Sequence, residues 1–218
     1  MDNYIILDTI SSGNFGKIVK AKNKFTNKLV AVKIESKSQN TLTYESRMYK
    51  YLSGIENIPK LRLFTTDIDN YYLIMDLLDY NLINYKIIIN NREINDKIIY
   101  IKELIIKLIN IIEDIHRKNI IHRDIKPENI CFKDNEPYLI DFGMAKQFIK
   151  NNKHIPEKNI TNIIGTPNYV SINIINMIEP SRRDDLESLI YIIIFLLLEN
   201  KDLQNYQKNS LFNKNHEK

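Results

Sequence analysis

Cysteine is almost absent from this sequence, since Cys131 is the single one among 218 residues. One thiol excludes an internal disulfide framework, and a reducing compartment is the default for such a chain. No secretory leader is expected, because Asp2, Asn3 and Asp8 interrupt any apolar core at the amino terminus and no small-residue cleavage site follows. We therefore expect a cytoplasmic or nuclear protein.

Long apolar runs and blocks of like charge are lacking as well. The run 189–198 is continuously apolar, but its ten residues are about half of the roughly 20 that span a bilayer. We expect a buried helix there and no membrane partner. The net charge of +4 is spread along the chain, so no nucleic-acid partner is predicted. Hydrophobic residues at 44% and charged residues at 27% are typical of a soluble globular protein.

The first 78 residues carry the pattern of a small antiparallel sheet with one helix. Alternating residues predict strands over 4–10, 18–21 and 28–35, and the first two flank a turn that contains glycine. Helical spacing over 44–52 offers Met48, Tyr51 and Leu52 for one face, and Ser53-Gly54 ends the helix. Strands over 61–64 and 71–75 would complete a five-stranded sheet.

Beyond a short polar hinge the chain becomes mainly helical. Apolar residues around much of the circumference of 98–115 predict a long core helix. Two short strands over 130–132 and 138–140 lead into a polar loop that lasts to about residue 167, and a loop of that length is usually functional. A last buried helix over 182–198 precedes a polar tail. The whole pattern predicts an α+β fold.

A loop between the first two predicted strands has the composition of a phosphate-binding turn. It reads Ile10-Ser11-Ser12-Gly13-Asn14-Phe15-Gly16-Lys17-Ile18-Val19. Glycine lets backbone amides approach a phosphate without an intervening Cβ atom. Alone the pattern is more typical of an ordinary hairpin turn. The candidate nucleotide contacts in this loop are Ile10, Ser12, Gly13, Gly16 and Ile18.

Lys33 lies within the apolar strand Val30-Ala31-Val32-Lys33, 17 residues beyond Gly16. Such a lysine would ordinarily hold its amine in water. Here Glu45 follows on the predicted helix, so an ion pair could aim the amine at phosphate oxygens. Lys33 and Glu45 therefore join the nucleotide-binding candidates.

The most specific segment is His122-Arg123-Asp124-Ile125-Lys126-Pro127-Glu128-Asn129, which Asp141-Phe142-Gly143 follows twelve residues after Asn129. These strings resemble the signature of protein kinases. Phosphoryl transfer needs a base near the attacking hydroxyl, cations around the phosphates and oxygen ligands for Mg²⁺. The resemblance makes Asp124 the base and Lys126 the phosphate stabiliser, with Asn129 and Asp141 holding the metal. It implies ATP and Mg²⁺ as cofactors and proteins as substrates.

Later segments resemble the casein kinase I family over about residues 4–198. They are Gly165-Thr166-Pro167-Asn168-Tyr169-Val170, then Ser171-Ile172-Asn173, and the string Ser181-Arg182-Arg183-Asp184-Asp185-Leu186-Glu187-Ser188-Leu189. The resemblance, together with Lys126 two positions after Asp124, implies serine or threonine hydroxyls as acceptors. It implies a bilobal fold, with a nucleotide-binding lobe over 1–78, a catalytic lobe over 79–200 and a polar tail over 201–218.

The same resemblance implies that Ala31 contacts the nucleotide, and it implies roles for five more residues. Met75 would lie beside adenine, and the backbone of Asp76 and Leu78 would bind it. Thr166 would contact the catalytic aspartate and lysine. Asp185 would be structural, opening the last helix and holding the backbone of the His-Arg-Asp loop.

Three departures from the family pattern limit what is carried over. Ser11 replaces the first loop glycine, which should stiffen the loop. Asn168 and Thr161 stand where cations are expected, although Lys158 remains, so we do not carry over the family's preference for phosphorylated substrates. Relatives continue for several helices beyond residue 198, which predicts a shortened C-terminal lobe. A protein partner or a second copy would then mask the apolar helix.

Two other classes remain open. A pseudokinase could keep the nucleotide cleft and act as a binding or scaffold module, and a decaying gene could give a poorly folded product. Among smaller signals, His122 fits a packed structural histidine. Cys131 fits a small core residue, with covalent accessibility as the alternative.

Overall fold

The computed structural model describes residues 1–13 and 16–198. Backbone contacts divide the chain into two compact units. Unit 1 contains Met1–Asp79 and Phe132–Gly143, and unit 2 contains Tyr80–Cys131 and the described residues from Met144 onward. The predicted lobe boundary at residue 78 stays a prediction, and the predicted tail lies outside the described residues.

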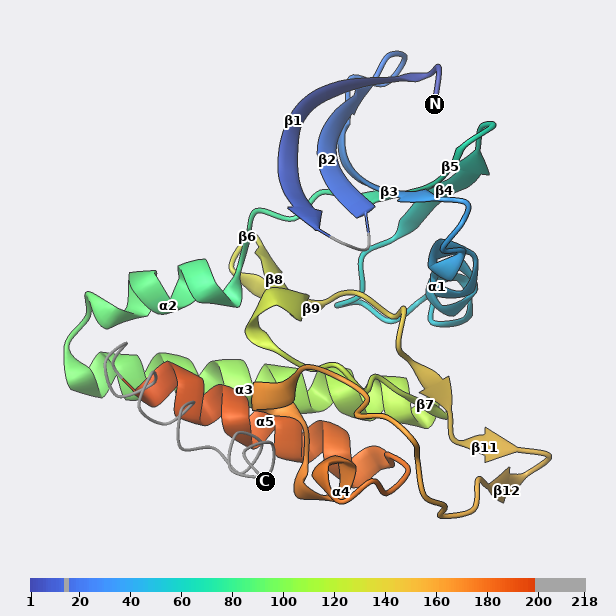
Figure 1. Cartoon of the computed structure of the whole chain (residues 1–218). Helices are drawn as coiled ribbons and strands as arrows, with labels where there is room; N and C mark the ends of the chain where they lie inside the picture. Colours follow the sequence, from blue (N-terminus) through green and yellow to red (C-terminus); the bar gives the residue numbers. More distant parts are fainter. Residues whose placement is uncertain (14–15, 199–218) are drawn as a thin grey trace. The chain divides into compact units, whose positions relative to one another are not determined.

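Unit 1 is built on the predicted five-stranded sheet, in which every neighbouring pair of strands is antiparallel (Figure 1). The strand order is β1-β2-β3-β5-β4. Alternate residues of β2, β3 and β5 face one side of the sheet and are buried together, as the two-residue period of a strand requires. The strands are β1 (Tyr4–Gly13), β2 (Gly16–Asn23), β3 (Leu29–Ser36), β4 (Leu61–Thr66) and β5 (Asn70–Asp76).

The helix of unit 1, α1 (Thr41–Tyr51), buries only part of the face that the sequence predicted, since Leu52 at its C-terminal end is 0% exposed. Leu42, Glu45 and Tyr49 are buried, whereas Tyr51 is 47% exposed. The prediction of Tyr51 on the apolar face was wrong. Buried residues recur every three or four positions on one side of a helix, and the buried residues of α1 follow that spacing, which leaves Tyr51 on the other side.

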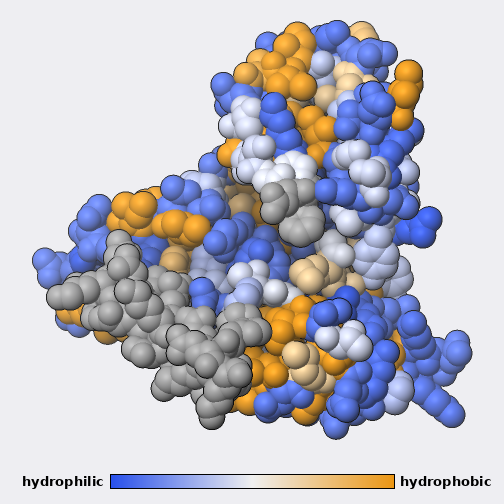
Figure 2. All heavy atoms as spheres, viewed as in Figure 1, coloured by the Kyte–Doolittle hydropathy of each residue, from blue (hydrophilic) through white to orange (hydrophobic). Residues whose placement is uncertain are grey.

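The edge strand β1 buries little of its side-chain surface. Ile5, Ile6 and Leu7 are each about half exposed, and Figure 2 shows apolar residues gathered over the strands of unit 1, at the top of the view. β1 is therefore held mainly by its backbone pairing with β2, which runs from Tyr4 to Gly13.

Gly16 is required by the backbone of the turn between β1 and β2. Its φ angle is +120°, and a Cβ atom there would lie 2.2 Å from the carbonyl oxygen of Ile34. Gly13, which pairs with Gly16 across the turn, has no atom within 4 Å of its Cβ position. The two glycines thus tolerate a side chain differently.

We predict that Gly16→Ala lowers the free energy of unfolding by at least about 2 kcal/mol, because the strained φ and the backbone clash act together. Gly13→Ala is the matched control and should change it by less than about 1 kcal/mol. Chemical denaturation of the two variants measures both values. Equal stabilities for the two variants would contradict the prediction.

Unit 2 is organised around two long helices, α3 (Ile94–Arg117) and α5 (Arg182–Leu197), which lie side by side (Figure 1). α3 buries Ile101, Leu104, Leu108, Ile111 and Ile115 at helical spacing. It ends where Asn119 adopts a left-handed conformation with φ of 61°, a common end for a helix. The remaining helices are α2 (Leu82–Asn90) and α4 (Ile172–Ile175), with short 3-10 turns at Pro127–Asn129 and Pro167–Tyr169.

Two segments depart from the predicted pattern. α2 occupies a stretch that the sequence suggested was only a hinge. The stretch predicted as one loop up to residue 167 contains short strands. They are β10 (Lys146–Gln147), which pairs with β7 (Ile120–Ile121), and the hairpin of β11 (Ile149–Lys150) and β12 (Lys153–His154). The last short strands are β6 (Tyr80–Asn81), β8 (Ile130–Lys133) and β9 (Glu136–Leu139).

α5 begins with a capping box and buries one face only. The Ser181 side chain and the Asp184 side chain each bond the backbone of the other residue. Leu189, Ile192 and Leu196 are buried, whereas Ile190 is 55% exposed. A partner or second copy over this helix stays a prediction. Among the described residues, no helix is both long enough and apolar enough to cross a membrane.

Candidate active site

The predicted ion pair is present in unit 1. The Lys33 amine lies 2.7 Å from Oε2 of Glu45 and 3.3 Å from Oδ1 of Asp141. The Glu45 side chain is 1% exposed and that of Lys33 is 17% exposed. Strand β3, helix α1 and the residue that follows β9 by two positions thus bring three predicted site residues together.

Burial and charge act in opposite directions on this pair. Burial lowers the pKa of Lys33, but the carboxylates of Glu45 and Asp141 outweigh it and raise that pKa above its ordinary value. Burial raises the pKa of Glu45 to about 7, although Lys33 opposes the shift. Lys33 therefore stays charged at neutral pH, whereas Glu45 titrates near neutral pH.

Tyr49 holds Asp141 and was not among the predicted site residues. The backbone N–H of Asp141 donates to the Tyr49 hydroxyl at 3.1 Å. The Tyr49 ring meets the Phe142 ring edge to face, with 5.2 Å between the ring centroids. Asp141 has a φ of 65°, which a non-glycine residue rarely adopts. The contacts from α1 therefore support the backbone turn that presents the Asp141 carboxylate to Lys33.

The remaining nucleotide-binding candidates also lie in unit 1. Ile18 on β2 pairs with Lys33 on β3, and Ala31 on β3 pairs with Met75 on β5. Ile10, Ser12 and Gly13 are on β1, Gly16 begins β2, and Leu78 follows β5 by two residues.

Asp76, the last residue of β5, already uses two of its polar groups. Its backbone N–H donates to the carbonyl oxygen of Lys60 at 3.2 Å. Its carboxylate accepts from Nε of Arg62 at 2.6 Å. The backbone bond from Asp76 to adenine stays a prediction.

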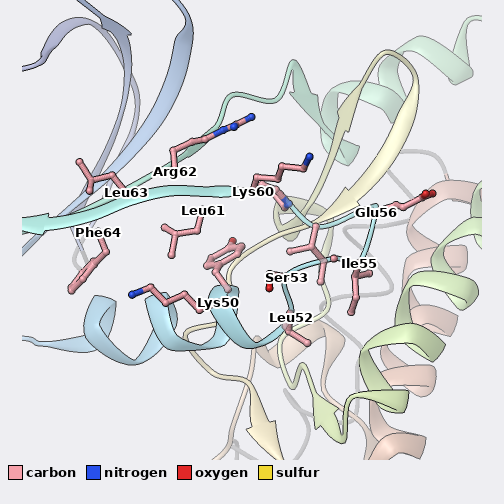
Figure 3. Close-up of a pocket in the computed structure, with 14 residues that line it drawn as sticks. Lys50, Leu52, Ser53, Ile55, Glu56, Lys60, Leu61, Arg62, Leu63 and Phe64 are labelled. Atoms are coloured by element: carbon pink, nitrogen blue, oxygen red, sulfur yellow. The ribbon is translucent and has the colours of Figure 1, made fainter. Parts of the chain in front are cut away.

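A cavity of about 770 Å³ lies elsewhere in unit 1, with α1 on one side and β4 on the other (Figure 3). Its lining includes the end of α1, the segment 52–60 and the first four residues of β4. None of the predicted site residues lines it. Tyr49 does line it, so one side chain contacts both this cavity and Asp141.

Unit 2 gathers the predicted catalytic residues around one carboxylate. The Thr166 hydroxyl donates to Oδ1 of Asp124 at 2.7 Å, and the Lys126 amine donates to that hydroxyl at 2.9 Å. The same amine lies 2.9 Å from Oδ2 of Asp124. The side-chain amide of Asn129 donates to the backbone oxygen and to Oδ2 of Asp124, at 2.9 and 3.1 Å. The His-Arg-Asp loop, the 3-10 turn Pro127–Asn129 and the segment around Thr166 thus all contact Asp124.

Asp185 holds the backbone of the His-Arg-Asp loop, as the sequence predicted. Its carboxylate accepts the N–H groups of His122 and Arg123, both at 2.9 Å, and contacts His116 at 2.8 Å. His122 is 1% exposed, and its Nδ1 accepts the N–H of Asp124 at 3.2 Å. Arg123 has a φ of 70°, a conformation that persists only where surrounding contacts enforce it.

Two carboxylates at the start of α5 hold the Ser171-Ile172-Asn173 segment by hydrogen bonds. The Ser171 hydroxyl and the Asn173 amide donate to Oδ1 of Asp184, at 2.6 and 3.1 Å. The Ile172 N–H donates to Oε1 of Glu187 at 2.8 Å. The two carboxylates of α5 therefore fix the segment that follows Thr166. The sequence pattern contains these residues but does not show that they touch.

The side chains predicted to hold magnesium have the right donor atoms. The amide nitrogen of Asn129 is committed to Asp124, which turns its amide oxygen toward other partners. Asp141 supplies a carboxylate that is 39% exposed. Oxygen donors of these types suit Mg²⁺. Asn129 belongs to unit 2 and Asp141 to unit 1.

Cys131 is only partly exposed, and burial raises the pKa of its thiol to about 12. A thiol needs its ionised form to attack an electrophile. These properties favour the interpretation of Cys131 as a packing residue.

The fold and the site agree with a comparison to known protein families. The family model described as the protein kinase domain matches residues 4–218. The chain therefore belongs to the protein kinase family.

Proposed function

We propose that this kinase transfers the γ-phosphate of ATP, with Mg²⁺, to serine or threonine hydroxyls of proteins. The observation that carries the proposal is the set of bonds that joins Asp124, Lys126 and Thr166. Asp124 is 8% exposed. Its Oδ1 accepts from the Thr166 hydroxyl, and its Oδ2 lies beside the Lys126 amine. A substrate hydroxyl that takes the place of the Thr166 hydroxyl would have an acceptor for its proton.

Lys126 places a positive charge beside this base. An amine in that position neutralises charge on a transferring phosphoryl group, which is the main task of a protein in this reaction. Its place two residues after Asp124 supports alcohol acceptors, by resemblance to serine and threonine kinases.

Lys33 and Glu45 would fix the phosphates of the nucleotide, and Asn129 and Asp141 would hold the magnesium. Bound Mg²⁺ supplies charge neutralisation to the phosphates. The proposal requires that the residue groups of the two units act on the same nucleotide.

A casein kinase I-like specificity is the finer part of the proposal. It is supported by the contacts of Ser171 and Asn173 with Asp184. These contacts join the two strings on which the resemblance to the casein kinase I family rests, the Ser-Ile-Asn segment and the string that begins at Ser181. Asn168 and Thr161 stand where the family pattern has cations, so a preference for phosphorylated acceptors is not part of the proposal.

The test is a transfer assay with radiolabelled ATP, Mg²⁺ and casein, followed by identification of the labelled amino acids. Label on serine or threonine supports the proposal, and label on tyrosine alone contradicts the acceptor class. A pseudokinase, which Ser11 in the loop favours, would bind ATP without any labelling of casein.

The pKa of Glu45 leads to a prediction about pH. Phosphotransfer should fall as pH drops below about 7, because protonation of Glu45 removes the negative partner of Lys33. Stability should change in the opposite sense. A folded-state pKa raised from 4.5 to about 7 gives a contribution that is present below pH 4.5 and lost as pH rises to 7.

Both effects are measured against Glu45→Gln, which cannot titrate. The difference between the wild-type protein and Glu45→Gln should show the acid limb in rate and the opposite slope in unfolding free energy. Parallel pH profiles for the two proteins would show that Glu45 is not the titrating group.

A further inference from the structure

Glu179 is a buried carboxylate on which three cations of unit 2 converge. Its side chain is 5% exposed, and Oε1 lies 2.6 Å from the Lys146 amine and 3.9 Å from Nη1 of Arg123. Oε2 lies 3.8 Å from the Lys158 amine. Arg123 belongs to the catalytic loop, Lys146 to β10, and Lys158 to the segment that leads to Thr166. One side chain thus connects three parts of the chain.

Backbone bonds tie the segment around Glu179 to the segment around Lys158. The N–H of Glu179 donates to the carbonyl of Lys158 at 2.9 Å, and the N–H of Ile160 donates to that of Met177 at 2.8 Å. The ion pair between Lys158 and Glu179 and these backbone hydrogen bonds therefore join the same two segments.

Arg123 connects the cations around Glu179 to the residue that precedes Thr166. Nε of Arg123 donates to the carbonyl of Met144 at 2.6 Å, which fixes the guanidinium. Gly165 packs so closely on the Arg123 carbonyl that a Cβ atom would lie 2.7 Å from it. The residue next to Thr166 is therefore seated on the backbone of the residue next to Asp124.

The three cations would repel one another without a negative charge between them. A carboxylate at these distances offsets that repulsion, and the cations compensate for its own burial. In kinases that are switched by phosphorylation, an added phosphate pairs with arginine and orders the activation segment. Here the chain supplies a carboxylate at an arginine of the catalytic loop.

We propose that Glu179 is a positioning residue, whose built-in charge holds the catalytic loop and the segment 158–166 together without an added phosphate. The inference rests on the proposed kinase function, and it assigns the ordering of Thr166 to Glu179. Glu179 acts through Arg123, Lys146 and Lys158, and does not touch the reacting groups.

The test compares Glu179→Gln, Glu179→Asp and Glu179→Ala with Glu113→Gln in the full chain, expressed without phosphorylation. Glu113 is 55% exposed and forms an ordinary ion pair with Arg117 on α3, so Glu113→Gln is the matched control. We expect Glu179→Gln to lower kcat for casein at least tenfold, with little change in KM for ATP. Glu179→Asp should keep more of the activity than Glu179→Gln. Tens of millimolar sulfate should raise the kcat of Glu179→Ala several-fold over chloride at equal ionic strength.

Hydrogen exchange gives a readout that does not depend on catalysis. The N–H groups of Ile160 and Glu179 should exchange at least tenfold faster in Glu179→Gln than in the wild-type protein and in Glu113→Gln. Melting curves identify any variant that does not fold, and Glu179→Asp then provides the comparison.

Wild-type exchange rates in Glu179→Gln would overturn the inference, whatever the activity. Equal kcat values for Glu179→Gln and the wild-type protein would overturn it as well. If the wild-type protein transfers no phosphate while exchange is still accelerated, the proposed function fails and the positioning contact stands.

Discussion

Asp124→Asn is expected to lower kcat for casein phosphorylation by at least about 100-fold. A positioned base contributes about 10²- to 10⁴-fold to a rate, and an amide cannot accept the proton. The substitution keeps the shape of the side chain, so the bond from the Thr166 hydroxyl can persist. Single-turnover transfer from radiolabelled ATP measures the effect on the chemical step.

The control for this variant is Asp114→Asn, which changes an exposed carboxylate of α3 that forms a surface ion pair with Arg117. It should retain wild-type kcat. Binding of Mg²⁺-ATP to Asp124→Asn should change little, which a thermal-shift titration can show. Equal labelling of casein by Asp124→Asn and the wild-type protein would defeat the proposed mechanism.

Lys33→Met is expected to lower kcat/KM for ATP by at least about 100-fold and to destabilise the fold. Hydrogen bonds to charged groups contribute about 1.5 to 3 kcal/mol each, so the loss of two such bonds to phosphate accounts for the rate. Removal of one partner from a buried ion pair costs about 3 kcal/mol, because Glu45 is left alone. Steady-state kinetics and urea unfolding at pH 8 measure the two effects.

The loss of stability should shrink at pH 6. There Glu45 is largely protonated even in the wild-type protein, so little ion pairing remains to be lost. Lys28→Met, at an exposed lysine of the turn before β3, is the control and should match the wild-type protein in both assays. A destabilisation independent of pH would contradict the role of the Lys33–Glu45 charge pair.

Much of the fold could be predicted because its strands and long helices repeat their apolar residues regularly. The period of two in β2, β3 and β5 and the helical spacing of α3 are visible in the sequence. α2 was missed because its exposed residues Ile83, Ile87 and Ile88 are at least as apolar as its buried ones, so the sequence shows no polar face to contrast with the core face. Asn81 was the available signal, since its side chain caps the helix by accepting the N–H of Asn84.

The site could be predicted where one short string contains the chemistry. Asp124, Lys126 and Asn129 lie within six residues, and the string that contains them indicated a protein kinase. Tyr49 and Glu179 could not be found in this way, because they act on residues 92 and 33 positions away. Their side chains have no special spacing, and only the folded chain brings a tyrosine to Asp141 or a carboxylate to Lys146.

The first turn of α5 and the His-Arg-Asp loop share one carboxylate, that of Asp185. If either part opens alone, the hydrogen bonds between the Asp185 carboxylate and the two loop N–H groups are lost, and the groups that stay buried have no partner. The helix start and the loop should therefore melt as one cooperative unit, with a common opening free energy. Mobility elsewhere in unit 2 can vary while the proposed chemical centre keeps its geometry.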